Sequence, residues 1–354
     1  MKRILLLLLA VALLVGFLAP FLNQSGLTDT EQPASFGFKE NLATTYGKTI
    51  AVPLKITESL QNVAVYLDDS LIFEKKNPSK KEVFFINTTH VTLGAHLLEL
   101  RATNTDGSPF SEQRNLRILS DLKPDNWTLE IVKNYPHTRT SFTQGLEFLG
   151  TQLFEGTGDP NEDGSSMVAK VALADGAIGF KKNLDASKFG EGITILNGEL
   201  FQLTWKNQQC FVYDVNSLEI KRELAYTGEG WGLCNDGQQL IMSDGTERIT
   251  FRDPKTFSAI RTIEVYTDQG PLPRLNELEY VDGLIYANIW TSSYIAVIDP
   301  KLGRVLALID AQNLVKEGQG TGEVLNGIAY QSATKKLFMT GKLWPTLFEV
   351  RIVK

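Results

Sequence analysis

Histidine and cysteine are scarce in this chain. Its 354 residues include three histidines and two cysteines. His90, His96 and His137 do not have the spacing of zinc ligands. Cys210 and Cys234 form neither a CxxC pair nor a disulfide framework, so we expect both thiols to be unpaired. The sequence also lacks a GxSxG motif, a P-loop and a dinucleotide fingerprint, and we expect no metal and no cofactor.

Positive charge is in deficit as well. Thirty-five lysines and arginines face 41 acidic residues, for a net charge of −6, which argues against nucleic-acid binding. The chain is 43% hydrophobic and 21% charged, as is typical of soluble globular proteins. Its length leaves room for one large domain or two ordinary ones.

Long hydrophobic runs are absent except at the N-terminus. Residues 4–22, "ILLLLLAVALLVGFLAPFL", carry no charge, are long enough to cross a bilayer and follow Lys2-Arg3. Because no A-x-A cleavage site is visible, we favour an uncleaved signal anchor over a removed signal peptide in residues 1–25. Residues 26–46 are interpreted as a polar tether. The rest of the chain is expected to be extracytoplasmic, in the periplasm or at the cell surface.

Short strand-like segments fill residues 47–120. Six of them, many with alternating apolar residues, are separated by turn signals such as "NTDG" (103–106). This density of strands favours a small immunoglobulin-like β-sandwich. The segment offers no catalytic constellation, so we interpret it as a spacer or interaction module.

An internal repeat occupies residues 121–354. Five strand–turn–strand stretches align: "TQGLEFLGTQLFEGTG" (143–158), "GEGITILNGELFQLTW" (190–205), "GWGLCNDGQQLIMSDG" (230–245), "LNELEYVDGLIYANIW" (275–290) and "LNGIAYQSATKKLFMTGK" (325–342). A second marker follows the first four, in the stretches 171–178, 213–220, 252–259 and 298–305, at intervals of 39 to 46 residues. Such intervals are typical of propeller blades.

The fifth repeat has no second marker before the chain ends at Lys354. The strand-like stretch "WTLEIVKNY" (127–135) precedes the first repeat and has no hairpin partner. We therefore predict that it completes the last blade and closes the ring. The predicted fold is all-β: a five-bladed β-propeller preceded by the sandwich and the N-terminal segment.

Two places in the repeat carry unusual residues. The first, at the start of the inner strand, is occupied by Gln144, Glu191, Trp231, Asn276 and Asn326. The second, at the end of its hairpin partner, is occupied by Gly158, Trp205, Gly245, Trp290 and Lys342. Because these are the same end of an antiparallel hairpin, both sets should surround one mouth of the central channel. Apolar walls with a few convergent polar groups predict a small-molecule pocket. The blander interpretation is that the amides cap strand ends, most of all Asn326, and that the indoles pack between blades.

Several motifs resemble a known family. They are "FTQGLEF", "FGEGITIL", "LFQLTW", "EGWGLCNDG", "LNELEY", "YANIW" and "TGKLWP". Their order is similar to that in the plant and bacterial type of glutaminyl-peptide cyclotransferase, or glutamine cyclotransferase, over about residues 128–354. The resemblance implies a five-bladed propeller that converts an N-terminal glutaminyl residue to pyroglutamyl and releases ammonia. It does not extend to the sandwich, and the chain does not resemble the zinc-dependent animal enzyme.

The resemblance implies that Glu191 is the catalytic carboxylate. It places pocket residues at Gln144, Trp205, Trp231, Asn276, Trp290 and Lys342. The stretch "GTGDPNEDGSSMVAKV" (156–171) is more acidic than is usual in the family, which bears on specificity at the mouth. Its "DPNEDG" (159–164) is only loosely similar to a calcium loop.

The chemistry suits these residue types. Ring closure needs a carboxylate that takes a proton from the α-ammonium and returns one to the leaving ammonia. An amide or an ammonium group stabilises the oxyanion, and indoles exclude water and attract the α-ammonium. We assign catalysis to Glu191, Asn276 and Lys342, and substrate binding to Gln144, Trp205, Trp231, Trp290 and Asn326.

The expected partners are peptides or proteins with N-terminal glutamine, acted on by a monomer that meets the membrane only through its N-terminal segment. The alternative function is a non-catalytic extracytoplasmic module that binds peptides or sugars at the propeller mouth.

Overall fold

The computed structural model describes residues 32–38 and 41–354. In this part of the chain the helical elements are α2 (Gln312–Gly318) and a single 3-10 turn (Thr88–His90), and all other regular elements are strands. The hydrophobic run 4–22 lies outside the described residues. Within them, no helix has the length and apolarity needed to cross a membrane.

The first eight strands form two sheets, with the orders β1-β3-β6 and β2-β8-β7-β4-β5. Buried and exposed residues alternate along β3 and β7, as expected where one face of a sheet packs on a core. The strands are β1 (Ala34–Phe36), β2 (Leu42–Thr45), β3 (Thr49–Ile56), β4 (Leu60–Leu67), β5 (Ser70–Lys76), β6 (Lys81–Asn87), β7 (Gly94–Asn104) and β8 (Pro109–Leu119). β1 and β2 lie inside the predicted tether and pair with β3 and β8, so regular structure begins ahead of residue 47.

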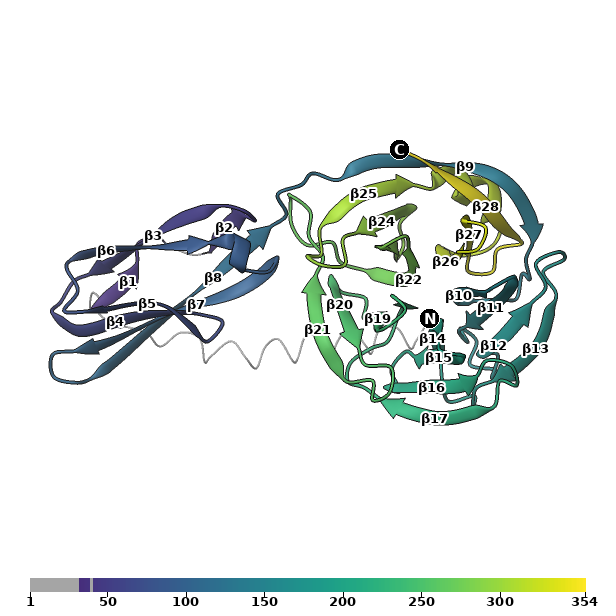
Figure 1. Ribbon diagram of the computed structural model, residues 1–354, viewed down its shortest axis with the longest axis horizontal. Helices are drawn as coiled ribbons and strands as arrows, with labels where there is room; N and C mark the ends of the chain where they lie inside the picture. Colours follow the sequence, from purple (N-terminus) through teal and green to yellow (C-terminus); the bar gives the residue numbers. More distant parts are fainter. Residues whose placement is uncertain (1–31, 39–40) are drawn as a thin grey trace, which may run out of the picture. The chain divides into compact units, whose positions relative to one another are not determined.

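The remaining strands, β9–β28, form three sheets of four strands and one sheet of eight. The three smaller sheets are antiparallel meanders: β10 (Thr143–Leu149) to β13 (Ile178–Asn183), β14 (Gly190–Leu196) to β17 (Ile220–Ala225), and β18 (Leu233–Asn235) to β21 (Ala259–Glu264). The two middle strands of each meander are, in chain order, β11 (Gln152–Thr157), β12 (Met167–Val171), β15 (Glu199–Thr204), β16 (Gln209–Asp214), β19 (Leu240–Ser243) and β20 (Arg248–Arg252). Figure 1 shows the sheets arranged around a central axis with β10, β14 and β22 innermost, which is a propeller-type fold.

The eight-stranded sheet has the order β22-β23-β24-β25-β9-β28-β27-β26. Its strands are β22 (Leu275–Val281), β23 (Leu284–Ile289), β24 (Tyr294–Ile298), β25 (Val305–Asp310), β9 (Asp125–Pro136), β28 (Thr346–Val353), β27 (Lys336–Gly341) and β26 (Leu325–Gln331). β9 pairs antiparallel with β28, as predicted for residues 127–135. It also pairs parallel with β25, so it joins the two halves of this sheet along the outside of the ring (Figure 1).

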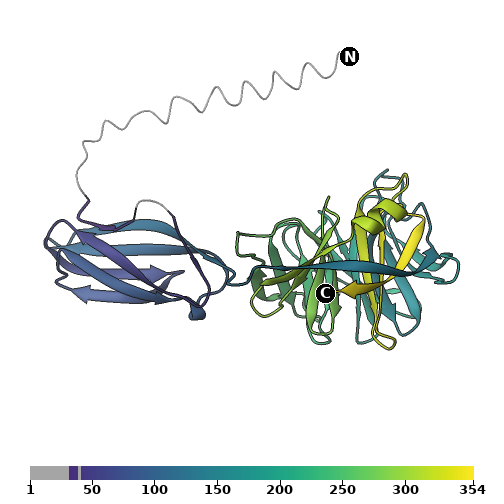
Figure 2. The same cartoon turned by 90° about the horizontal axis from the view of Figure 1, so that it is seen from above.

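The predicted hairpins are present. β10–β11, β14–β15, β18–β19, β22–β23 and β26–β27 pair antiparallel. In the β14–β15 turn, Asn197 and Gly198 have φ values of 54° and 77°, as a two-residue turn with both central residues left-handed requires. Figure 2 shows the propeller strands from the side, with α2 on one face of the ring.

Glycine next to the first repeat place lets the inner strands approach one another. A Cβ atom on Gly192 would lie 2.5 Å from the backbone nitrogen of Leu233, and one on Gly232 would lie 2.0 Å from the Asn276 carbonyl oxygen. Neither distance is tolerable, so these positions need glycine. The close approach brings the neighbouring residues Glu191, Trp231 and Asn276 around one narrow mouth.

In the fourth repeat the glycine place holds Glu277, which is 1% exposed. Its carboxylate accepts hydrogen bonds from the backbone N–H groups of Leu146 (3.3 Å) and Ile328 (2.9 Å), which belong to β10 and β26. It therefore joins three inner strands. Burial raises its pKa well above the usual value.

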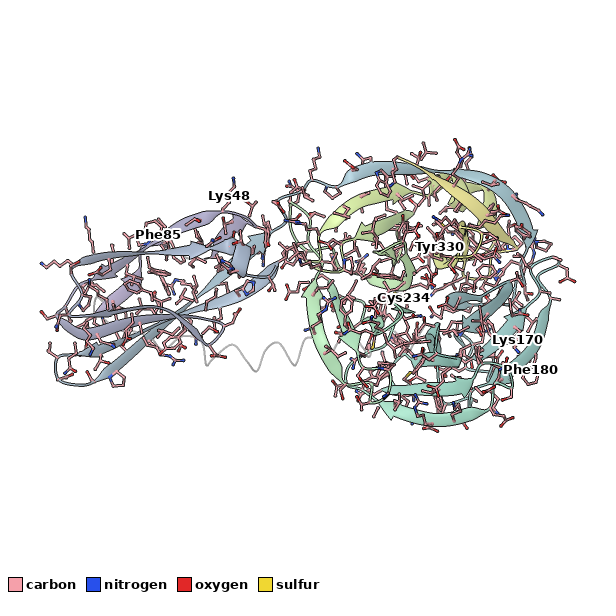
Figure 3. All side chains as sticks on the ribbon, in the orientation of Figure 1. Lys48, Phe85, Lys170, Phe180, Cys234 and Tyr330 are labelled. Atoms are coloured by element: carbon pink, nitrogen blue, oxygen red, sulfur yellow. The ribbon has the colours of Figure 1, made fainter. Side chains whose placement is uncertain are left out.

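Apolar residues fill the space between sheets. Cys210 and Cys234 belong to two separate clusters of this kind and are buried and unpaired, which confirms the expectation for both thiols. Cys234 lies near the centre of the ring (Figure 3).

Candidate active site

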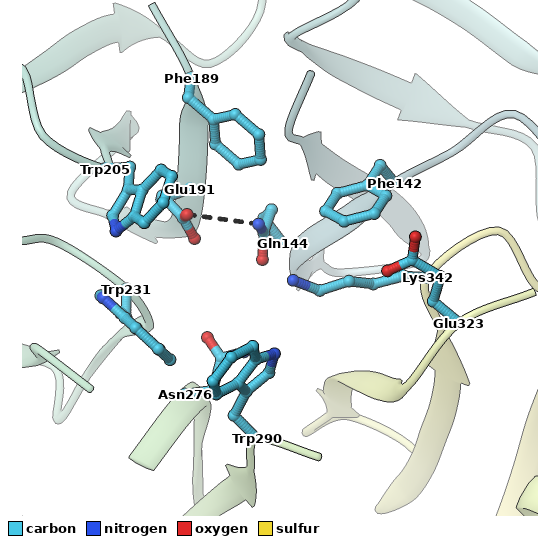
Figure 4. Close-up of a pocket in the computed structure, with 10 residues that line it drawn as sticks. All are labelled: Phe142, Gln144, Phe189, Glu191, Trp205, Trp231, Asn276, Trp290, Glu323 and Lys342. Carbon is cyan, nitrogen blue, oxygen red and sulfur yellow. Dashed lines mark hydrogen bonds between the residues drawn. The ribbon is translucent and has the colours of Figure 1, made fainter. Parts of the chain in front are cut away.

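One cavity of about 220 Å³ lies where the two repeat places meet. Seven of the eight predicted site residues line it, which leaves only Asn326 outside the lining. The lining residues are Phe142, Gln144, Phe189, Glu191, Trp205, Trp231, Asn276, Trp290, Glu323 and Lys342 (Figure 4). They come from loops and strand ends of all the inner hairpins.

Glu191 is the buried acid of this cavity. It lies on β14 and is 5% exposed. Loss of hydration raises the pKa of its carboxyl group well above the usual value, the charge of Lys342 opposes this, and the charge of Glu229 adds to it. A carboxyl group with a raised pKa can both accept and return a proton near neutral pH.

Lys342 follows β27 and is also 5% exposed. Burial lowers the pKa of its ammonium group, while the charges of Glu191 and Glu323 oppose that effect. The ammonium nitrogen lies 4.6 Å from the centre of the Phe142 ring. Figure 4 shows the Glu191 carboxylate and the Lys342 ammonium directed into the same cavity, with Gln144 between them.

A buried hydrogen bond between a histidine and a glutamate supports the loop that follows Lys342. His137 Nε2 lies 3.1 Å from Glu155 Oε1, and His137 Nδ1 lies 2.7 Å from the Trp344 carbonyl oxygen. The Leu343 N–H donates to the Ser141 carbonyl oxygen at 2.8 Å. The backbone around Lys342 is thus fixed from both sides.

Three amides have different positions. Asn326 donates from Nδ2 to the Thr143 carbonyl oxygen (2.9 Å) and to Gln144 Oε1 (3.4 Å), and Gln144 Nε2 in turn donates to Glu191 Oε1 (3.3 Å). Asn326 therefore orients the Gln144 amide without itself lining the cavity. Asn276 is 2% exposed, lines the cavity, and has a side-chain oxygen with no hydrogen-bond partner among the described residues. A buried acceptor without a partner is costly unless a bound molecule or water fills the place.

Aromatic rings form the walls. Phe189 packs edge-on against Trp205 at 5.7 Å between ring centres, and Trp231 packs edge-on against Trp290 at 5.7 Å. Trp290 is 41% exposed and stands at the rim. The walls of the cavity are therefore formed largely by packed aromatic rings.

Glu229 holds two of the indoles. Its Oε2 atom accepts hydrogen bonds from Trp205 Nε1 (2.8 Å) and Trp231 Nε1 (3.0 Å). The two tryptophans belong to different hairpins, so one carboxylate fixes the orientation of both.

Sequence reasoning missed Phe142, Phe189, Glu229 and Glu323. A signal for three of them exists: Phe142, Phe189 and Glu229 each lie two residues before a residue of the first repeat place. Side chains two apart in an extended chain share a face, so this place also faces the mouth. No comparable signal marks Glu323.

The fold and the cavity define a propeller-type protein with a carboxylate and a lysine in an indole-walled pocket. The chain belongs to the glutamine cyclotransferase family, whose model matches residues 103–352. A glutaminyl-peptide cyclotransferase of Arabidopsis thaliana is 39% identical over 230 residues, which are 63% of this chain and 71% of that protein. The crystal structure of Myxococcus xanthus glutaminyl cyclase is similar with a TM-score of 0.61 and 37% identity, over 65% of this chain and 98% of that one.

Proposed function

We propose that this protein is a glutaminyl-peptide cyclotransferase, which converts N-terminal glutaminyl residues of peptides or proteins to pyroglutamyl and releases ammonia. The observation that carries the proposal is the buried Glu191 carboxylate, which shares an indole-walled cavity with Lys342. Membership of the glutamine cyclotransferase family favours this function over a module that only binds peptides or sugars.

The reaction begins with the α-amine of the substrate. Glu191 takes a proton from the α-ammonium, and the free amine attacks its own γ-carboxamide carbon. Folding of the glutaminyl side chain between the indoles brings the two atoms together, and such an intramolecular geometry supplies much of the acceleration. The carboxyl proton of Glu191 then passes to the leaving nitrogen, and ammonia departs as its bond to the γ-carbon breaks. The ring nitrogen loses its second proton to Glu191, which passes it to the departing ammonia, so ammonium leaves and the carboxylate is restored.

The tetrahedral intermediate carries an oxyanion. Lys342 supplies an ammonium group inside a buried cavity, where a donor of this kind contributes about 3 kcal/mol to transition-state stabilisation. Gln144 donates to Glu191 and orients it, while Asn326 fixes Gln144. The Asn276 side-chain oxygen lacks a partner and is placed to accept from an N–H group of the substrate.

The indoles have a binding role. Trp205, Trp231 and Trp290 enclose the aliphatic part of the glutaminyl side chain and offer π-faces to the α-ammonium before it loses its proton. Exclusion of water prevents hydrolysis of the carboxamide as a competing reaction.

A direct test compares peptides that begin with Gln, Glu and Asn. Purified protein should release ammonia and form a pyroglutamyl peptide from the Gln peptide, with far slower reaction of the other two. Tight binding of the Gln peptide with no ammonia released would instead support the binding module.

The architecture around this site extends the proposal. We count the eight-stranded sheet as two blades joined through β9, which gives five blades in residues 121–354 and agrees with the five repeats. We assign an immunoglobulin-like topology to the sandwich of residues 47–120, preceded by a tether (26–46) and a signal segment or anchor (1–25). The protein would then act as a monomer outside the cytoplasm, and its recovery from the cytosolic fraction of cells would contradict that location.

A further inference from the structure

A groove of about 630 Å³ lies beside the catalytic cavity. Phe189 and Trp205 line both hollows, so the groove is continuous with the mouth of the cavity. Its other walls come from three loops, and its lining residues are Asp159, Pro160, Glu162, Ala186, Ser187, Lys188, Lys206 and Asn207. The acidic stretch that follows the first repeat thus forms one side of the groove.

The two lysines of the groove have partners in the protein. Lys188 Nζ donates to Gln209 Oε1 at 2.8 Å. Lys206 Nζ lies 3.9 Å from the centre of the Trp205 ring and 4.0 Å from Glu229 Oε1. Both ammonium groups therefore have a contact within the protein, Lys188 with a neutral amide and Lys206 with an indole ring and a carboxylate.

The buried acid of the groove is satisfied as well. Asp159 is 3% exposed and accepts hydrogen bonds from the backbone N–H groups of Asp163 (3.1 Å), Gly164 (2.6 Å) and Ser165 (3.2 Å). These bonds fix the loop and lower the pKa of the Asp159 carboxyl group against the opposing effect of burial. Asp159 also accepts from the Ser165 hydroxyl group at 2.9 Å, so four hydrogen bonds within the loop occupy its carboxylate.

Glu162 differs from these three residues. It is exposed, it lines the groove, and no hydrogen bond or ion pair within the described residues involves its carboxylate. Glu162 is therefore the one charged side chain lining the groove whose charged group has no hydrogen-bond or ion-pair partner in the described part of the chain.

We propose that this groove binds the residues that follow the N-terminal glutamine and favours lysine or arginine among them, through pairing with Glu162. The inference rests on the proposed function and names its substrate class. A cavity of about 220 Å³ encloses the reacting residue, and the rest of the peptide must leave past its rim. The groove offers a path past Phe189 and Trp205, and its lining includes these two rings and the Glu162 carboxylate.

The test measures kcat/KM for three substrates: glutamine amide, a Gln-Lys-Gly amide and a Gln-Glu-Gly amide. Exposed ion pairs contribute about 0.2–1 kcal/mol, so the wild-type protein should prefer the lysine peptide over the glutamate peptide by up to about fivefold at low salt. Since such pairs are screened, the preference should shrink at high salt. Glu162→Gln should bring the ratio close to one, and Glu162→Lys should invert it.

Glu219→Gln is the matched control, because it removes the same charge from an exposed residue that does not line the groove. It should keep the wild-type ratio. Equal wild-type rates for the two peptides, or a preference that survives in Glu162→Lys, would overturn the inference. Turnover of glutamine amide with no charge preference contradicts the groove alone, whereas failure with all three substrates contradicts the proposed function and this inference together.

Discussion

Glu229 does not touch the cavity, yet its replacement should weaken substrate binding. Glu229→Ala removes the acceptor of both the Trp205 and the Trp231 indole N–H groups. Hydrogen bonds to charged groups contribute about 1.5–3 kcal/mol each when buried. The Glu229 side chain is 41% exposed, so we reduce this to about 1 kcal/mol per bond. Two bonds give about 2 kcal/mol, or roughly a 30-fold change.

The loss of binding free energy in Glu229→Ala should appear mainly as a higher KM. The indoles contact substrate in the ground state and in the transition state alike, so misplacing them weakens binding throughout the reaction. Glu229→Gln keeps an oxygen acceptor and should raise KM much less than Glu229→Ala.

The two variants share a second effect, which depends on charge. The Glu229 carboxylate raises the pKa of Glu191, and Lys342 lowers it. Without the charge of Glu229 the acid limb of the pH–kcat/KM profile should move to lower pH, in Glu229→Gln as in Glu229→Ala. A residue that only held the fold together would not move this limb.

Steady-state kinetics on a Gln-initiated dipeptide measures both effects. The pH range should run from about 4 to about 9, which covers the titration of a carboxyl group whose pKa is raised above its usual value. Glu219→Gln serves as the control, because Glu219 is exposed in the turn between β16 and β17 and does not line the cavity, and it should leave KM and the profile unchanged. An unchanged KM in Glu229→Ala, together with an unmoved acid limb in Glu229→Gln, would refute the role given to Glu229.

Three further predictions concern two cavity residues and Glu147, a carboxyl group on β10 that accepts a hydrogen bond from the Thr194 hydroxyl group at 2.8 Å. Lys342→Met should lower kcat by about 10²-fold and move the acid limb to higher pH, because the ammonium group lowers the pKa of Glu191; full activity would exclude its oxyanion role. Trp205→Ala should raise KM more than it lowers kcat, and the reverse pattern would place the indole in the chemical step. Burial raises the pKa of Glu147 from 4.5 to about 7, so the native state loses stability as pH rises through that interval. The shift corresponds to about 3 kcal/mol, reduced to about 2 for partial exposure, and Glu147→Gln should remove that loss in denaturant unfolding at pH 5 and pH 8.

Much of the propeller could be predicted because its repeat is regular. Hairpin turns such as Asn197-Gly198 and the recurring second marker predicted the inner strands, and the missing fifth marker predicted the pairing of 127–135 with the C-terminal strand. The parallel pairing of β9 with β25 was not predictable, because no local sequence pattern specifies the strand that pairs with the second edge of β9. β1 and β2 were missed for a related reason: they are three and four residues long and depend on pairing with β3 and β8.

The part of the site that could be predicted consists of residues whose positions follow from the geometry of the inner hairpins. Residues at the start of one strand and at the end of its hairpin partner share one end, which placed Glu191 and Trp205 in one cavity. Asn326 obeys the same rule but turns its amide to Thr143 and Gln144, because β10 and β26 lie close enough for that bond. Such second contacts depend on distances between blades, which the sequence does not encode in any short pattern.

Glu191 transfers the proton in the proposed reaction, and the variant Glu191→Gln is the sharpest test of that role. Glutamine keeps the shape and the contact with Gln144 but cannot accept a proton from the α-ammonium. We expect kcat to fall by at least about 10²-fold with a smaller change in KM, measured as ammonia release from a Gln-initiated dipeptide. Near wild-type turnover of the correctly folded variant, with an unchanged pH profile, would contradict it.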